Sequence, residues 1–279
     1  MRLLLVLLLM SPAALAAQPL KVAVSIIPLK TLVEAVGGDR VEVVSMTRPG
    51  DNPAVYNPSP RQIHAASSAD LLFFVGVPLE RLWLERIRAA RPTLRLVDVR
   101  RGIELRRLEE HHGHDGRSDL DPHVWTSPPL ARRMAAAIRD ALTEADPAHR
   151  NHFEQGFQRL AARIDGVDRQ IRKLLAPVKQ RRFLVFHPAW GYFADTYGLT
   201  QAAVETGGKA PGARALAKLI EQAKAENIRV IFVQPQFSTR LAQRIAQAIG
   251  ARVATLDPLG PDFLDQALKA AEIIAGRQR

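Results

Sequence analysis

The stretch PAHRNHFEQGFQRLAARIDGVDRQIRKLLA, residues 147–176, decides the fold. Its apolar residues recur at alternating spacings of four and three, which predicts one face of a continuous helix. Such a helix, started and capped by Asp146 and Pro147, would be about 45 Å long at 1.5 Å per residue. Few single domains need that length, whereas two lobes joined by a rigid rod do. The apolar positions are Phe153, Phe157, Leu160, Ile164, Val167, Ile171 and Leu174.

A coiled-coil dimer is the alternative interpretation of this heptad-like stripe. It is less favoured because the heptads begin and end inside a globular chain.

Short apolar runs alternate with helical patterns on both sides of this stretch. This alternation predicts the α/β class, with parallel sheets. We therefore expect two similar parallel-sheet α/β lobes bridged by one long rigid helix. The expected divisions are a signal peptide at 1–17, an N-terminal lobe at 18–146, the linking helix at 147–177 and a C-terminal lobe at 178–279. The strand patterns cover 21–27, 41–46, 70–76, 94–99, 182–187, 201–204, 230–233 and 253–256.

The first residues have the pattern of a signal peptide. Arg2 precedes a short apolar run from Leu3 to Met10, and small residues around Ala16 follow. The run is shorter than the roughly 20 residues that span a bilayer as a helix. The sequence thus predicts export, and a buried N-terminal helix is the less favoured alternative.

Composition narrows the chemistry of any site. The chain has no cysteine, so a metal would be held by nitrogen and oxygen ligands and never by thiolate. The net charge is +11, but the arginines are spread over helices and do not form one basic block with interleaved aromatic residues. We therefore expect a solvated basic surface and no nucleic-acid partner.

Three residues at the ends of predicted elements are candidate metal ligands. His123 lies in Asp121-Pro122-His123-Val124-Trp125, between a proline and a helix, and His187 ends a predicted strand. Asp257 follows the last strand. Ligands in open α/β sheets bind beyond the carboxyl ends of strands, so two imidazoles and a carboxylate from different lobes could form a Zn, Mn or Fe(II) site. Each residue alone more often caps a turn.

Five segments, taken together, resemble the periplasmic metal-binding proteins of zinc and manganese ABC importers, the ZnuA/TroA-like solute-binding family. They occur in the family's order over essentially the whole mature chain. The resemblance implies two α/β lobes bridged by one long helix, a metal held between them, and His123, His187 and Asp257 as ligands. The segments are Tyr56-Asn57-Pro58-Ser59-Pro60, Asp121–Trp125, Phe186–Phe193, Pro235–Ser238 and Leu256–Gly260.

The chain departs from the family pattern at the fourth ligand. Where the family carries His after the proline of an early loop, this chain has Ala54, which has no donor atom. A water, Tyr56 or a histidine from the loop 106–121 could complete the shell. Gln234 stands where many relatives have Glu, and the remaining auxiliary candidates are His111, His112 and His114. These three resemble the histidine-rich loop of the zinc-specific branch, or are incidental in a solvated loop.

The resemblance implies an extracytoplasmic solute-binding protein that captures a divalent transition metal and delivers it to an ABC permease in the inner membrane. Zn²⁺ is the first choice and Mn²⁺ or Fe²⁺ the second. We expect a periplasmic monomer and no enzyme activity. The alternatives are a binder of chelated metal or of metal delivered by a periplasmic partner protein, and a metallohydrolase. The last is disfavoured because no general base stands beside His123 or His187.

Overall fold

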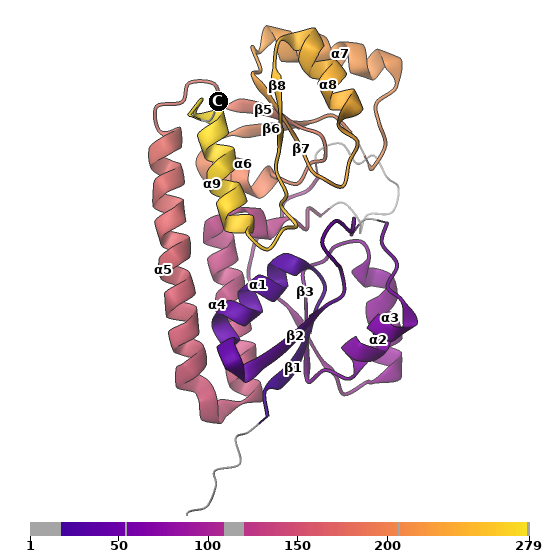
Figure 1. Ribbon diagram of the computed structural model, residues 1–279, viewed down its shortest axis with the longest axis vertical. Helices are drawn as coiled ribbons and strands as arrows, with labels where there is room; N and C mark the ends of the chain where they lie inside the picture. The colour runs from indigo at the N-terminus through magenta and orange to yellow at the C-terminus, as the bar shows by residue number, and fades with distance from the viewer. Residues whose placement is uncertain (1–17, 54, 109–119, 206, 278–279) are drawn as a thin grey trace, which may run out of the picture.

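Two four-stranded parallel sheets form the centre of the protein, in a computed structural model that describes residues 18–53, 55–108, 120–205 and 207–277. Each sheet has helices on both sides, and one long helix runs along both lobes (Figure 1). The predicted α/β class with two bridged lobes is therefore confirmed. The expected signal peptide, residues 1–17, lies outside the described residues.

The first lobe has the strand order β2-β1-β3-β4, and all neighbouring strands are parallel. Helices α1 and α4 lie on one side of the sheet, and α2 and α3 lie on the other (Figure 1). Strands covered on both faces have continuous apolar runs, as in β1, where Val22, Ala23 and Val24 are all buried. The elements are β1 Leu20–Val24, α1 Ile27–Gly37, β2 Val41–Ser45, α2 Pro60–Ser67, β3 Leu71–Phe74, α3 Glu80–Ala90, β4 Arg95–Asp98 and α4 Pro128–Ala145.

The second lobe repeats this plan with the strand order β6-β5-β7-β8. Alternate residues of β5 face opposite sides: Phe183 and Val185 join the core beneath α6 and α9, whereas Leu184 joins the core beneath α7 and α8. This period of two is the expected strand geometry. The elements are β5 Arg182–Val185, α6 Gly191–Tyr197, β6 Thr200–Ala203, α7 Ala213–Ala225, β7 Val230–Val233, α8 Thr239–Ile249, β8 Arg252–Thr255 and α9 Phe263–Ile274.

The long helix α5 spans Arg150–Leu175, 26 residues, and a short 3-10 turn at Pro147–His149 precedes it. The expected capping by Asp146 is wrong. Its carboxylate instead contacts His149 Nδ1 at 2.7 Å and Arg40 at 3.5 Å. The 3-10 turn carries the imidazole of His149 to this carboxylate, which therefore bonds a side chain and not a helix N–H.

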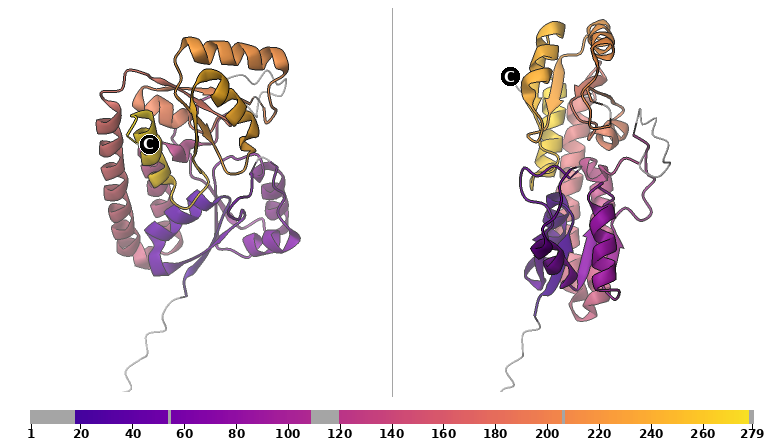
Figure 2. Two further views of the ribbon diagram at one scale, coloured as in Figure 1. Left: turned by 45° about the horizontal axis from the view of Figure 1, so that its top comes forward. Right: turned by 90° about the vertical axis from the view of Figure 1, so that its right-hand side faces the viewer.

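Helix α5 belongs to both hydrophobic cores. Its first half contributes Phe153, Phe157 and Ile164 to the core of the first lobe, and its second half contributes Val167 and Ile171 to the core of the second. The helix lies along the edge of both lobes in Figure 1, and two further views show the same arrangement (Figure 2).

Helix α9 also joins the two lobes. Its first residues, Phe263 and Leu264, are buried in the core of the first lobe, whereas Ala267 and Ile273 are buried in the core of the second. The lobes are thus connected by two helices that both cores share. Within the described part of the chain, no helix is both long enough and apolar enough to cross a membrane.

Candidate metal centre

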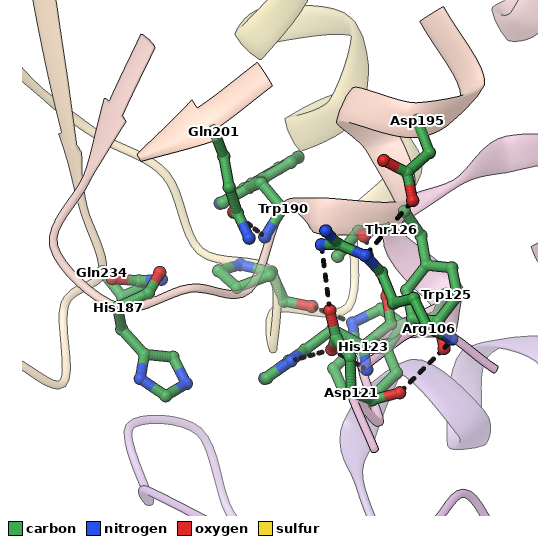
Figure 3. Close-up of polar contacts among 12 residues, drawn as sticks. Arg106, Asp121, His123, Trp125, Thr126, His187, Trp190, Asp195, Gln201 and Gln234 are labelled. Atoms are coloured by element: carbon green, nitrogen blue, oxygen red, sulfur yellow. Dashed lines mark hydrogen bonds and ion pairs between the residues drawn. The ribbon is translucent and has the colours of Figure 1, made fainter. Parts of the chain in front are cut away.

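Two imidazoles from different lobes meet between the sheets. His123 precedes a 3-10 turn at Val124–Thr126 that leads into α4, and His187 follows β5. Their ring centroids are 5.3 Å apart, and the ring planes cross at 76° (Figure 3). The residues are 64 positions apart in sequence but meet in space, as the hypothesis of a site between the lobes requires.

A buried carboxylate holds His123 from behind. Oδ1 of Asp121 lies 2.7 Å from Nδ1 of His123 and also accepts the His123 backbone N–H at 2.9 Å. Asp121 itself is fully buried. An ionised carboxylate can only accept a hydrogen bond, so Nδ1 carries the imidazole proton and Nε2 keeps its lone pair.

His187 has the same kind of support in the second lobe. Its Nδ1 contacts Oε1 of Glu205, a buried residue just beyond β6. The ring of Phe237 stacks on the imidazole with centroids 5.2 Å apart, and Nε2 of Gln234 donates to the His187 carbonyl at 3.0 Å. Backbone and ring are therefore both fixed, and the proton again belongs on Nδ1.

The electrostatics favour neutral imidazole at His187. Burial lowers its pKa below the ordinary value, and the nearby His123 lowers it further, although Glu205 and Asp121 act in the opposite direction. Neutral imidazole is the form that binds a metal. The two rings together thus offer two nitrogen lone pairs of the kind that zinc prefers.

The carboxylate of Asp257 is hydrogen-bonded within the second lobe. Oδ1 of Asp257 accepts from Nε2 of Gln236 at 3.2 Å and from the backbone N–H of Leu259 at 3.1 Å. The neighbouring Pro258 carbonyl accepts from Nε1 of Trp125 in the first lobe at 2.7 Å. The described residues contain no group of three His, Cys, Asp or Glu side chains close enough to hold a metal ion. The role of Asp257 as a ligand therefore stays a prediction.

The auxiliary candidates divide into two groups. The hydroxyl of Tyr56 donates to Oε1 of Gln62 at 3.0 Å, so it is engaged by helix α2. Ala54 and the loop histidines His111, His112 and His114 lie outside the described residues. Their predicted contributions to the site stay predictions.

Reasoning from the sequence missed the two carboxylates. Asp121 stands in the segment around His123 without a predicted role, and Glu205 belongs to none of the predicted site segments. The adjacent His123 could have pointed to Asp121, because ligating histidines commonly donate to a carboxylate. Glu205 lies 18 residues from His187, and only the pairing of β5 with β6 brings them together.

The chain is similar to a family of zinc-uptake proteins. The family described as "Zinc-uptake complex component A periplasmic" matches residues 22–272. A putative metal-binding protein of Treponema pallidum (strain Nichols) is 29% identical over 251 residues, covering 85% of this chain and 78% of that protein. The high-affinity zinc uptake system protein ZnuA of Yersinia pestis is 27% identical over 263 residues, covering 86% of this chain and 83% of that protein.

Solved structures show the same architecture. A crystal structure of ZnuA superposes with a TM-score of 0.86 at 36% identity and covers 92% of this chain and 98% of its own. A ZnuA deletion mutant with zinc bound superposes with a TM-score of 0.84 at 36% identity, covering 92% of this chain and 97% of its own.

Proposed function

The chain belongs to the family of periplasmic zinc-uptake complex components, and we propose that it captures zinc between its two lobes and delivers it to an ABC permease. A component of an uptake system binds and hands over its cargo and performs no reaction on it. The protein is therefore a solute-binding protein and not an enzyme.

The pair of opposed imidazoles carries this proposal. Each has its Nδ1 occupied by a buried carboxylate, Asp121 on one side and Glu205 on the other. Both Nε2 lone pairs are thereby left for an ion, and a borderline cation such as zinc suits two imidazoles better than a hard cation does. The carboxylates also increase the basicity of the two rings and fix their orientation, which strengthens metal binding.

We propose His123, His187 and Asp257 as the protein ligands. Asp257 would add one negative charge and reach the ion after a rearrangement of its hydrogen bonds to Gln236 and Leu259. Water or Tyr56 would fill the remaining position of a tetrahedral shell. The two imidazole nitrogens and the carboxylate oxygen also suit Mn²⁺ and Fe²⁺, which are the second choices.

Location and partners follow from the same proposal. The N-terminal residues 1–17 would direct export to the periplasm as a signal peptide. The protein would act there as a monomer and meet its permease at the inner membrane. Metal delivered by a periplasmic partner protein, or bound to a chelator, is an alternative source of the cargo.

The test is the metal affinity of the chelator-stripped mature protein, offered Zn²⁺, Mn²⁺ and Fe²⁺ in turn in competition with a chromogenic chelator. We expect one tightly bound zinc per chain. His123→Ala and His187→Ala are each expected to weaken zinc binding at least about 100-fold, because each removes one of few ligands. Asp257→Ala tests the third ligand in the same assay.

His64→Ala is the matched control, since it removes an exposed imidazole of α2 and is expected to leave zinc affinity unchanged. Zinc binding that survives the loss of either central histidine would contradict the proposed site. Failure of every free ion to bind the wild-type protein would overturn capture of free zinc.

A further inference from the structure

Arg106, in the first lobe, contacts the Asp121 carboxylate that holds His123. Nη1 of Arg106 lies 3.4 Å from Oδ2 of Asp121, the carboxylate oxygen that does not contact His123. Nε of the same guanidinium lies 3.2 Å from Oδ2 of Asp195 on helix α6 of the second lobe. Figure 3 shows both contacts beside His123. The Arg106 guanidinium therefore links Asp121, the carboxylate that contacts His123, to the second lobe.

The second lobe leaves a slot for this guanidinium at Gly191, the first residue of α6. A Cβ atom at Gly191 would lie 1.2 Å from Nη1 of Arg106 and 2.9 Å from Oδ2 of Asp121. No side chain larger than hydrogen is therefore compatible with this position of Arg106. Gly191 lies only four residues after His187, so the slot belongs to the segment that also carries the second imidazole.

Tyr192 of α6 forms hydrogen bonds with the backbone of both Asp121 and Arg106. Its hydroxyl donates to the backbone carbonyl of Asp121 at 2.9 Å and accepts the backbone N–H of Arg106 at 3.1 Å. The backbone N–H of Asp121 donates in turn to the Arg106 carbonyl at 2.9 Å. Burial raises the pKa of Tyr192 to about 12, so the phenol keeps the proton that it donates.

Asp121 is thus fixed through both its backbone and its side chain. Its side chain is fully buried, and that of Arg106 is only 16% exposed, whereas that of Asp195 is 59% exposed. Removing one partner of a buried ion pair is costly because it leaves an uncompensated charge, whereas an exposed ion pair contributes little. Of these two ion pairs of Arg106, the one with Asp121 is accordingly the one expected to affect the orientation of His123.

We propose that Arg106 is a positioning residue of the metal centre: it orients Asp121 so that His123 presents Nε2 to the crevice, and it joins this support to α6 of the second lobe. This inference rests on the proposed function. It assigns a role in zinc binding to a residue that does not touch the ion, and it makes Gly191 a requirement of that role.

The test compares zinc affinity in Arg106→Gln, Gly191→Ala and wild-type protein by chelator competition. Both variants are expected to bind zinc about 10- to 100-fold more weakly, the usual loss when the support of a ligating histidine is removed. Gly191→Ala changes no charged or ligating group, so its effect would arise from displacement of the Arg106 guanidinium and of the Asp121 oxygen beside it. Arg106→Lys keeps the charge but loses the fork geometry, and it is expected to bind with intermediate affinity.

Arg163→Gln is the matched control. It also removes one arginine and one ion pair between helices, that of Arg163 on α5 with Asp265 on α9 at 3.3 Å. We expect zinc affinity within twofold of wild type. Bound Co²⁺ supplies a second measurement, because its visible absorption reports ligand geometry: Arg106→Gln should alter the spectrum and Arg163→Gln should not.

Wild-type affinity in Arg106→Gln and Gly191→Ala would overturn the inference while leaving the zinc function intact. Equal losses in Arg106→Gln and Arg163→Gln would overturn it too, since they would reflect net charge. If Arg106→Gln does not fold, Arg106→Lys and Gly191→Ala decide the question by the same criteria. Absence of zinc binding in the wild-type protein would instead contradict the proposed function.

Discussion

Burying a carboxylate costs free energy, and this fold buries Glu80, Asp121 and Glu205. Asp121 and Glu205 recover that cost through the imidazoles of the metal centre. For Glu80 the backbone offsets only part of that cost: it accepts the N–H groups of Val75 at 2.9 Å and Gly76 at 2.5 Å, just beyond β3. It thereby ties the first turn of α3 to the end of the strand before it.

Glu80 makes stability depend on pH. Burial raises its pKa from 4.5 to about 7, against the opposing effect of its hydrogen bonds and of Arg100. The folded protein therefore binds this proton more tightly than the unfolded chain does. The contribution of Glu80 to stability is fully present below pH 4.5 and is lost as the pH rises through about 7.

We expect Glu80→Gln to remove this dependence. Between pH 4.5 and 8, the free energy of unfolding of the wild-type protein should fall relative to that of the variant by up to about 3 kcal/mol. Urea denaturation of the zinc-free proteins at several pH values measures the difference. The variant also loses one acceptor for a backbone N–H, but that loss is the same at every pH. Parallel pH profiles would contradict the assignment.

At the scale of single residues, the sequence predicted His123 and His187 as partners, and the structure brings them together. Strand ends and a proline-flanked histidine identify such residues because both features are local. Glu205 and Arg106 could not be predicted in the same way. Their roles depend on contacts between lobes or between neighbouring strands, which no local spacing encodes.

At the scale of elements, helix α5 depends on close contact with α1. Gly156 is buried, and a Cβ atom placed there would lie 2.2 Å from the carbonyl oxygen of Val36 in α1. The contact is with backbone, which cannot move aside as a flexible side chain can. Gly166, on the same helix, has open space around it, with its nearest neighbour, Nη2 of Arg169, at 3.9 Å.

The two glycines should therefore respond in opposite directions to alanine. Gly156→Ala is expected to lower the free energy of unfolding by about 1–3 kcal/mol, because α5 must move away from α1. Gly166→Ala is expected to raise it by up to about 1 kcal/mol, because alanine favours helix. Chemical denaturation of both variants provides the comparison. A neutral Gly156→Ala would show that the helices can separate without cost.

The heptad-like stripe predicted α5 almost to its ends. The burial of its apolar positions from Phe153 to Ile171 follows from periodicity alone. Periodicity shows which face of a helix is buried but not what buries it. It therefore could not show that α9 serves both cores, nor that Asp146 would bond His149 in place of a helix N–H.

At the scale of the whole molecule, two shared helices restrict the motion of the lobes. Hinge closure would have to pull Phe263 of α9 or Phe153 of α5 out of the first core, at the cost of buried apolar area. Hydrogen bonds between the lobes also oppose it, such as that from Nε1 of Trp125 to the Pro258 carbonyl at 2.7 Å. We therefore expect zinc to produce local adjustment and not a large closure.

Small-angle X-ray scattering tests this expectation. The radius of gyration of the zinc-loaded protein should differ from that of the zinc-free protein by less than about 1 Å. His123→Ala with added zinc serves as the control for effects of the metal on the solvent and on aggregation. A contraction of several ångströms that occurs only with an intact site would show that the shared helices bend.

The dual membership of α9 also sets an order of events during biosynthesis. The core of the first lobe includes Phe263 and Leu264, which are made long after its four strands. A nascent chain that has completed 20–146 therefore still exposes apolar surface at that core. It stays a substrate for chaperones and proteases until the last helix emerges.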